Sequence, residues 1–111
     1  MIAPRVTSEF WISSLKKRLE AQAIPIFVVQ RGDKQAGAIA IRVSNLRGSS
    51  KLFIQALSFY GERRWLEFMD GLDSEIEDAL EYQKKSDQDL WIIEVEKCES
   101  KNFLKEFLLS D

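Results

Sequence analysis

Near the start of the chain, hydrophobic residues recur at the spacing of an α-helix. Thr7 or Ser8 is a suitable N-cap, and Glu9 would then lie in the positively polarised first turn. The apolar face consists of Trp11, Ile12, Leu15, Leu19 and Ala23. Pro25 predicts that the helix has ended before it.

Three runs rich in β-forming residues follow, at 26–30, 38–43 and 51–59. The segments between them, 31–37 and 46–50, contain the glycine and polar residues that are typical of turns. Strands joined by short turns usually pair with each other, so the pattern predicts an antiparallel meander.

Residues 63–69 fit either a strand or a helix, and their aromatic residues and short length favour a fourth strand. Asp70-Gly71 should end it. Ser74 and Glu77 have the spacing of a capping box, which predicts a helix over 74–86.

The stretch 87–96 predicts a buried strand that begins with two acids and carries Glu94 inside an apolar run. A buried carboxylate needs a partner, so we expect an arginine from the first half of the chain to pair with Glu94. The tail, 100–111, fits either a short docked helix or a hairpin strand.

These elements predict a single α+β domain over residues 1–111. Its sheet would be mostly antiparallel with four to five strands, packed by an N-terminal helix and by a second helix before the last main strand. Apolar residues make up 45% of the 111 residues, which is enough for one core.

Cys98 has no second cysteine to pair with, and no signal peptide or membrane span is visible, so we expect a cytoplasmic protein without a membrane partner.

Charge is unevenly distributed along the chain. Residues 1–64 contain eleven Lys/Arg and four Asp/Glu, a net of +7, whereas residues 65–111 contain five and fourteen, a net of −9. The two halves could form a polarised surface that steers a partner. The favoured interpretation is that they pack together and neutralise each other.

The residue types exclude several chemistries. The sequence has no His, which rules out Ser-His-Asp and Cys-His nucleophile systems within one chain and disfavours a zinc site. Gly32 and Gly37 have the spacing of a phosphate loop, but Ala38-Ile39 stand where Lys and Ser/Thr are required, so the segment is interpreted as a hairpin turn. We predict no cofactor.

The acids around the last main strand are the oxygen ligands that Mg²⁺ prefers. They are Asp87, Asp89, Glu94 and Glu96. Alternation along a strand places the first two on one face and the last two on the other, which disfavours a metal site.

Arginines at predicted strand ends are the second candidate. Their planar forks suit carboxylate or phosphate, and stacking on a tryptophan would hold one flat. The tentative ligand-binding residues are Arg31, Arg63, Arg64, Trp65, Asp89, Trp91 and Glu94. An internal Arg–Glu pair is the favoured interpretation, and a pocket for a small anion or nucleotide is the alternative. The net charge of −2 disfavours nucleic acid as a partner.

An ordered set of short motifs resembles a known family. It comprises Val6-Thr7-Ser8-Glu9-Phe10-Trp11, Arg31-Gly32-Asp33 followed by Ala36-Gly37-Ala38-Ile39, Arg63-Arg64-Trp65, and Asp87-x-Asp89-Leu90-Trp91-Ile92-Ile93-Glu94-Val95-Glu96. The set is similar to the domain of unknown function 1491 family, small uncharacterised proteins known mainly from alphaproteobacteria. Gln88 stands where the family pattern favours Pro, and the tail after Asn102 is unusually apolar. The resemblance implies a small cytoplasmic α+β domain and supplies no activity.

Three Trp and seven Phe exceed what a small core needs, and no complete catalytic constellation is present. We therefore predict a non-catalytic binding or protein-interaction module that associates with itself or with another protein. The alternative is an enzyme or sensor domain that binds a small anionic ligand or nucleotide through its arginines.

Overall fold

The computed structural model describes residues 6–57, 63–96 and 102–108. In chain order, the elements are α1 (Ser8–Ala21), β1 (Ile26–Gln30), β2 (Ile39–Ser44), β3 (Ser49–Leu57), β4 (Arg63–Leu72), α2 (Asp73–Ser86), β5 (Trp91–Glu96) and a short π-type helix, η1 (Leu104–Leu108). The strand predicted for the ambiguous segment 63–69 is confirmed by β4.

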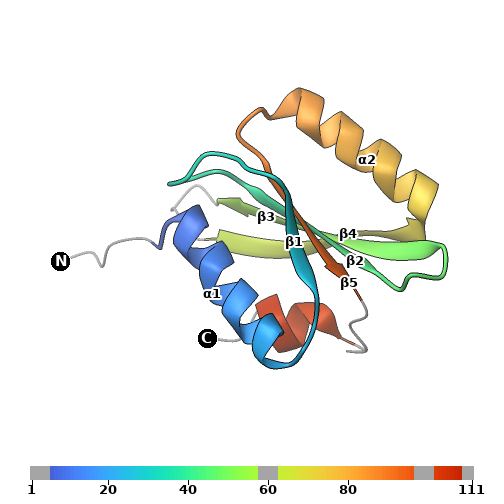
Figure 1. The fold of residues 1–111 in the computed structure, drawn as a ribbon. Coiled ribbons are helices and arrows are strands. Elements are labelled where there is room, and N and C mark those ends of the chain that lie inside the picture. Colours follow the sequence, from blue (N-terminus) through green and yellow to red (C-terminus); the bar gives the residue numbers. More distant parts are fainter. Residues whose placement is uncertain (1–5, 58–62, 97–101, 109–111) are drawn as a thin grey trace.

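One five-stranded sheet organises the chain, with strand order β1-β5-β2-β3-β4. Neighbouring strands are antiparallel except β5 and β2, which are parallel. Figure 1 shows α2 over one face of the sheet and α1 with η1 on the other. The predicted α+β domain with a mostly antiparallel sheet is confirmed.

The first helix begins as its sequence predicts. The Thr7 hydroxyl accepts a hydrogen bond from the backbone N–H of Phe10 at 3.1 Å, which satisfies one of the unpaired donors of the first turn. The helix ends earlier than Pro25, because Ala23 adopts a positive φ of 59° and the Ile24 N–H bonds to the Leu19 carbonyl. The prediction that Ala23 lies on the apolar helical face is wrong.

The strand order departs from the predicted meander. Only β2, β3 and β4 form one, because β5 lies between β1 and β2. The segment 31–37 is therefore a crossing loop and not a hairpin turn. The physical reason is that β5 is largely buried on both faces, and such a strand is most stable inside a sheet with a neighbour on each side.

The junction of β4 and α2 also differs from the prediction. Asp70-Gly71 does not break the strand, which runs to Leu72 and passes directly into α2. The N-cap is Leu72 in place of Ser74, and the Glu75 carboxylate accepts a hydrogen bond from the Leu72 N–H at 2.9 Å. Pairing of Gly71 with Ser50 extends β4 past the residues that looked like a turn.

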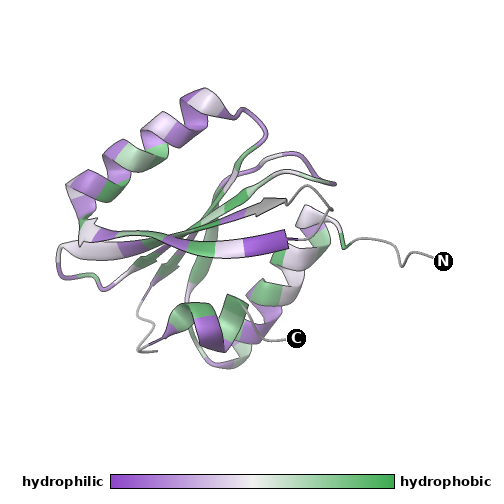
Figure 2. Cartoon of the chain, turned by 180° about the vertical axis from the view of Figure 1, so that it is seen from behind, coloured by the Kyte–Doolittle hydropathy of each residue, from purple (hydrophilic) through white to green (hydrophobic). Residues whose placement is uncertain are grey.

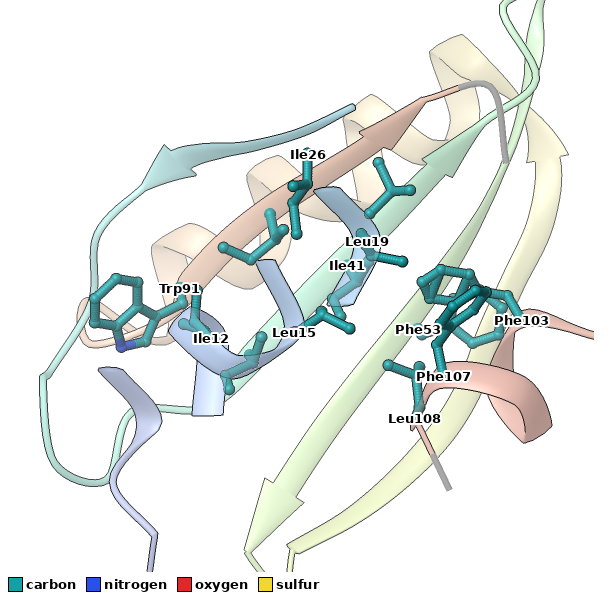
Figure 3. Packing of buried hydrophobic residues seen from close by; sticks show 13 residues of the cluster. Ile12, Leu15, Leu19, Ile26, Ile41, Phe53, Trp91, Phe103, Phe107 and Leu108 are labelled. Carbon is teal, nitrogen blue, oxygen red and sulfur yellow. The ribbon is translucent and has the colours of Figure 1, made fainter. Parts of the chain in front are cut away.

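The larger core lies between the sheet and the layer of α1 and η1. In Figure 3, the side chains of Phe53, Phe103 and Phe107 gather beside Leu108, while Trp91 and Ile12 lie at the opposite end of the same layer. The ring centroids of Phe53 and Phe103 are 5.5 Å apart. For the tail, the docked helix is thus the correct alternative.

A smaller core lies under α2. Its buried members are Ala40, Leu52, Ile76, Leu80, Leu90 and Ile92. Figure 2 shows that α2 is mostly hydrophilic, whereas hydrophobic residues are dense on η1. The second helix therefore covers the sheet with a narrow apolar stripe and leaves the rest of its surface in water.

Phe107 tests how much η1 contributes. Its side chain is 4% exposed, so Phe107→Ala should lower the free energy of unfolding by about 3 kcal/mol through lost burial and a cavity. Urea denaturation measures this value. Lys105→Ala on the exposed side of η1 is the matched control and should change stability by less than about 0.5 kcal/mol. Equal effects of the two substitutions would contradict the docking of this helix.

Candidate functional site

A hollow lies between α1 and β1, and we call it the α1–β1 groove. Its lining residues are Glu9, Ile12, Ser13 and Lys16 on α1, Val28 and Arg31 on or just after β1, and Trp91 on β5. Its volume is about 290 Å³. It combines apolar, hydroxyl and charged groups, which is typical of a binding surface.

The loop 31–37 fixes one end of the groove. The Trp91 indole N–H donates to the Asp33 carbonyl at 2.7 Å, and the Asp33 N–H donates to the Asp89 carbonyl at 3.0 Å. A Cβ on Gly32 would collide with the Asp89 carbonyl and the Trp91 ring. The glycine is therefore required for the loop to lie this close to the entrance of β5.

Arg31 lies over the Trp91 ring, which agrees with the prediction that an arginine stacks on a tryptophan. Its guanidinium carbon is 5.3 Å from the ring centroid, and one of its nitrogens is 3.1 Å from the Glu9 carboxylate. The two charged side chains are 67% and 45% exposed, so water and salt weaken this ion pair. Arg31 thus remains accessible to a ligand or partner that enters the groove.

Arg63 has a different set of contacts, on the other side of the start of α1. Its guanidinium donates to the Gln55 side-chain oxygen at 2.7 Å, the Ser8 hydroxyl at 2.9 Å and the Gln35 carbonyl at 3.2 Å. A fourth bond reaches the Val6 carbonyl at 3.2 Å. These contacts tie β3 and β4 to the first turn of α1.

The other predicted ligand-binding residues lie in separate parts of the fold. Trp65 packs against Trp11 in a tilted arrangement with ring centroids 5.1 Å apart, and Arg64 is exposed. Asp89 is exposed and its N–H donates to the Asp87 carboxylate at 2.9 Å, so the two acids form a polar turn before β5. The structure brings Arg31 and Trp91 together and does not gather all seven predicted residues in one site.

Glu94 lies on the opposite face of the sheet, under α2, and there an arginine pairs with it. The partner is Arg42, whose Nε is 3.9 Å from the Glu94 carboxylate. The expected pairing with an arginine from the basic half is confirmed. Sequence reasoning did not single out Arg42, although it is the only charged residue within the 38–43 run and shares its strand face with Ala38 and Ala40.

Arg42 is the centre of a polar cluster at the start of α2. Its Nη2 is 2.9 Å from the Asp73 carboxylate, and its Nε donates to the Ser50 hydroxyl at 3.1 Å. The Ser50 hydroxyl in turn donates to Asp73 at 2.5 Å, while Glu77 lies 3.7 Å from Arg42. The arginine side chain is only 14% exposed, so these carboxylates compensate a largely buried cation.

Ion pairs of this kind join the two oppositely charged halves of the chain. Besides Arg42, Lys51 lies 3.8 Å from the Glu67 carboxylate. Both cations belong to the basic first half, and their partners belong to the acidic second half. The contacts agree with the favoured interpretation that the halves pack together.

The outer edge of β1 is the second notable feature beside the groove. Glu96 donates its N–H to the Pro25 carbonyl at 3.0 Å. In an antiparallel pair the backbone groups of successive residues point alternately toward and away from the partner strand. The N–H and C=O of Phe27 therefore point toward β5, and those of Ile26 and Val28 point outward. Within the parts of the chain that the structure describes, no strand pairs with this edge.

A smaller hollow of about 140 Å³ lies at the far end of β2, β3 and β4. Val43 and Phe103 supply its apolar wall, and Lys51 and Asp70 bring opposite charges to it. The strand edge beside it is that of β4, which carries charged residues, and the cation that lies over an aromatic ring, Arg31, is in the α1–β1 groove. The α1–β1 groove is therefore the stronger candidate.

Among the described residues, no three metal-ligating side chains of Cys, Asp or Glu come together. No helix in the described ranges has the length and hydrophobicity of a membrane span.

Asp73 gives the polar cluster a dependence on pH. The hydrogen bond from Ser50 and then the hydrogen bond and charge of Arg42 hold the pKa of Asp73 below its usual 3.8, although desolvation opposes them. A carboxyl group with a lowered pKa stabilises the fold at pH values above its unfolded pKa, and this stabilisation is lost as the pH falls through the folded pKa.

The difference in unfolding free energy between the wild type and Asp73→Asn should therefore be largest near neutral pH and shrink below 3.8. Urea denaturation between about pH 7 and about pH 3 measures it. Asp78→Asn changes an exposed carboxylate on the same helix and is the control. We expect its difference in unfolding free energy from the wild type to change less with pH. A difference for Asp73→Asn that stays constant with pH would contradict the assignment.

Comparison with solved structures finds close relatives of this fold. A crystal structure of a DUF1491 family protein from Caulobacter crescentus CB15 is 26% identical, covers 84% of this chain and 89% of its own, and superposes with a TM-score of 0.72. The solution structure of Atu0922 from A. tumefaciens is 30% identical, with coverage of 87% and 90% and a TM-score of 0.75. An NMR structure of a DUF1491 family protein from Caulobacter crescentus CB15 is 25% identical, with coverage of 91% and 94% and a TM-score of 0.77.

The comparison with curated proteins finds no match. A family model described as "Protein of unknown function (DUF1491)" matches residues 6–105. This match spans nearly the whole chain and includes every motif on which the resemblance depends. The chain therefore belongs to the DUF1491 family.

Proposed function

We propose that this protein is a non-catalytic interaction module that binds a protein partner by adding a strand to the outer edge of β1. The observation that supports this role is the outer edge of β1, which exposes apolar side chains and pairs with no strand in the described ranges. Phe27, Val28 and Val29 are 49%, 39% and 61% exposed. An edge strand of this kind presents free backbone donors and acceptors to another chain.

The other edge of the sheet has a different character. β4 also exposes apolar side chains, those of Leu66, Phe68 and Leu72, but its register shifts beside Phe68. It carries four charged residues as well, Arg63, Arg64, Glu67 and Asp70. Charged residues and bulges are the features by which proteins prevent edge-to-edge pairing. β1 contains no charged residue. The contrast supports β1 as the edge that accepts a partner strand.

The α1–β1 groove would add specificity to this mode of binding. Backbone hydrogen bonds along an edge are nearly independent of sequence, whereas a pocket beside the edge selects a side chain. Val28 belongs to both features, since its backbone faces outward at the edge and its side chain lines the groove. A partner strand and its side chain would therefore be bound at one continuous surface.

Val28→Pro tests the role of the edge. Proline removes the outward N–H at this position and is tolerated on an edge strand, so the variant should remain folded and lose its partners. The measurement is quantitative comparison of proteins captured by the wild type and by the variant, with circular dichroism as the check on folding.

Val28→Thr keeps the N–H and a similar side-chain shape, and it is the matched control. Partners that depend on the edge should be retained by Val28→Thr and lost by Val28→Pro. Light scattering across a dilution series shows whether a second copy is among them. Identical capture by all three proteins, together with an unchanged monomer, would contradict the proposal.

Binding of a small anionic ligand is a second candidate function, and the position of Arg31 favours it. A cation held over Trp91, with Lys16 in the same groove, could accept a phosphate or carboxylate. This ligand would not need the strand edge, so Val28→Pro should leave its binding intact.

Thermal-shift measurements with nucleotides and other small anions test this second function. A ligand at ~100 times its Kd stabilises the fold by about 2.7 kcal/mol, which raises the melting temperature by roughly ten degrees. Arg31→Gln should abolish the shift. Arg47→Gln removes an exposed arginine in the turn between β2 and β3 and should leave it unchanged. The absence of a shift across the panel would remove this candidate.

A further inference from the structure

We infer that the partner is an extended peptide segment that places an apolar side chain in the α1–β1 groove and an acidic side chain beside Lys16 and Arg31. This inference rests on the proposed function and specifies the chemistry of the partner. It follows from the geometry of the edge, the lining of the groove and the charges at its rim.

The edge determines how the backbone of the segment would lie. Outward N–H and C=O groups at Ile26 and Val28 offer four hydrogen-bonding positions to an added strand. Pro25 has no N–H and the register of β1 shifts after Val28, so the regular part of this edge is short. A segment of a few extended residues matches it.

The groove determines which side chain the segment would present. Residues of an added strand point alternately to the two faces of the sheet, so one residue would point toward the side on which α1 lies. The apolar residues that line the groove are Ile12, Val28 and Trp91, and its volume is about 290 Å³. A large apolar side chain would fill this space and exclude water from it.

The rim determines the charge of the neighbouring residue. Lys16 and Arg31 are two cations in the groove, against the single carboxylate of Glu9. Because the bond between Arg31 and Glu9 is exposed, it competes weakly with an incoming carboxylate. The groove thus has a net positive charge, which complements an Asp or Glu on the partner.

A second copy of the chain fits this surface less well. If β1 paired with β1 of another molecule, the added strand would be Ile26–Gln30, which has no acid to meet Lys16, and Arg31 would follow it. A stable dimer also buries roughly 800 Å² on each partner, whereas β1 exposes only three apolar side chains. A peptide segment requires less area and can supply the missing carboxylate.

The experiment starts with selection of random dodecapeptides displayed on phage, with the whole chain as the target. Selected peptides should share an apolar residue close to an acidic one. Their affinities are then measured as synthetic peptides against the wild type, Lys16→Glu and Lys17→Glu. Lys17 is an exposed neighbour on the same helix that does not line the groove, so its substitution makes the same charge change in a different place.

Lys16→Glu should raise the Kd of an acidic peptide by about three- to tenfold, and Lys17→Glu should change it by less than about twofold. N-methylation of alternate peptide N–H groups tests the strand mode without any change in the protein. Methylation on the edge facing β1 should abolish binding, and methylation on the opposite edge should not.

The outcomes separate the inference from the proposed function. Selected peptides without acidic residues, or equal effects of Lys16→Glu and Lys17→Glu, would overturn the acidic-peptide inference, while loss of partners in Val28→Pro would still support strand addition. Dimerisation that Val28→Pro abolishes, without any selected peptide, would identify a second copy as the occupant and also overturn the inference. Failure of both peptide selection and edge-dependent capture would overturn both proposals.

Discussion

Burial of β5 on both faces is the constraint on which the rest of the structure depends. Trp91, Ile93 and Val95 face the layer of α1 and η1, while Leu90 and Ile92 before and within the strand face α2. A strand of this composition is stable only between two neighbours and under two covering layers. Its insertion between β1 and β2 moves β1 to the rim of the sheet, and this displacement creates the exposed edge.

The same insertion explains where the polar groups lie. β5 runs parallel to β2, which places Arg42 beside Glu94 in register and under the start of α2. The loop that carries the chain from β1 to β2 must pass the entrance of β5, and there it holds Trp91 and positions Arg31 above the ring. The Arg42 cluster thus joins elements inside the fold, whereas Arg31 lies at an accessible rim.

Local elements could be predicted from the sequence because their signals are local. Helical spacing and the Thr7 cap locate α1, and the short apolar runs locate the strands. The pairing of Glu94 with an arginine also followed, since a carboxylate in an apolar run requires a cation. The position of β1 next to β5 could not be predicted, because the two segments are more than sixty residues apart and the local sequence of neither one indicates its partner strand. The start of α2 was misplaced for a related reason, since the pairing of Gly71 with Ser50 extends β4 through residues that resemble a turn.

The pairing of Ile26 with Val95 has a consequence for how the chain folds during synthesis. The first helix and β1 leave the ribosome long before β5, so β1 has neither of its edges occupied until nearly the whole domain has emerged. Contacts of such large sequence separation also slow folding, because the long loop between them must close first. The apolar strand that we propose as a docking edge in the folded protein is therefore also a segment that is exposed to aggregation in the nascent chain.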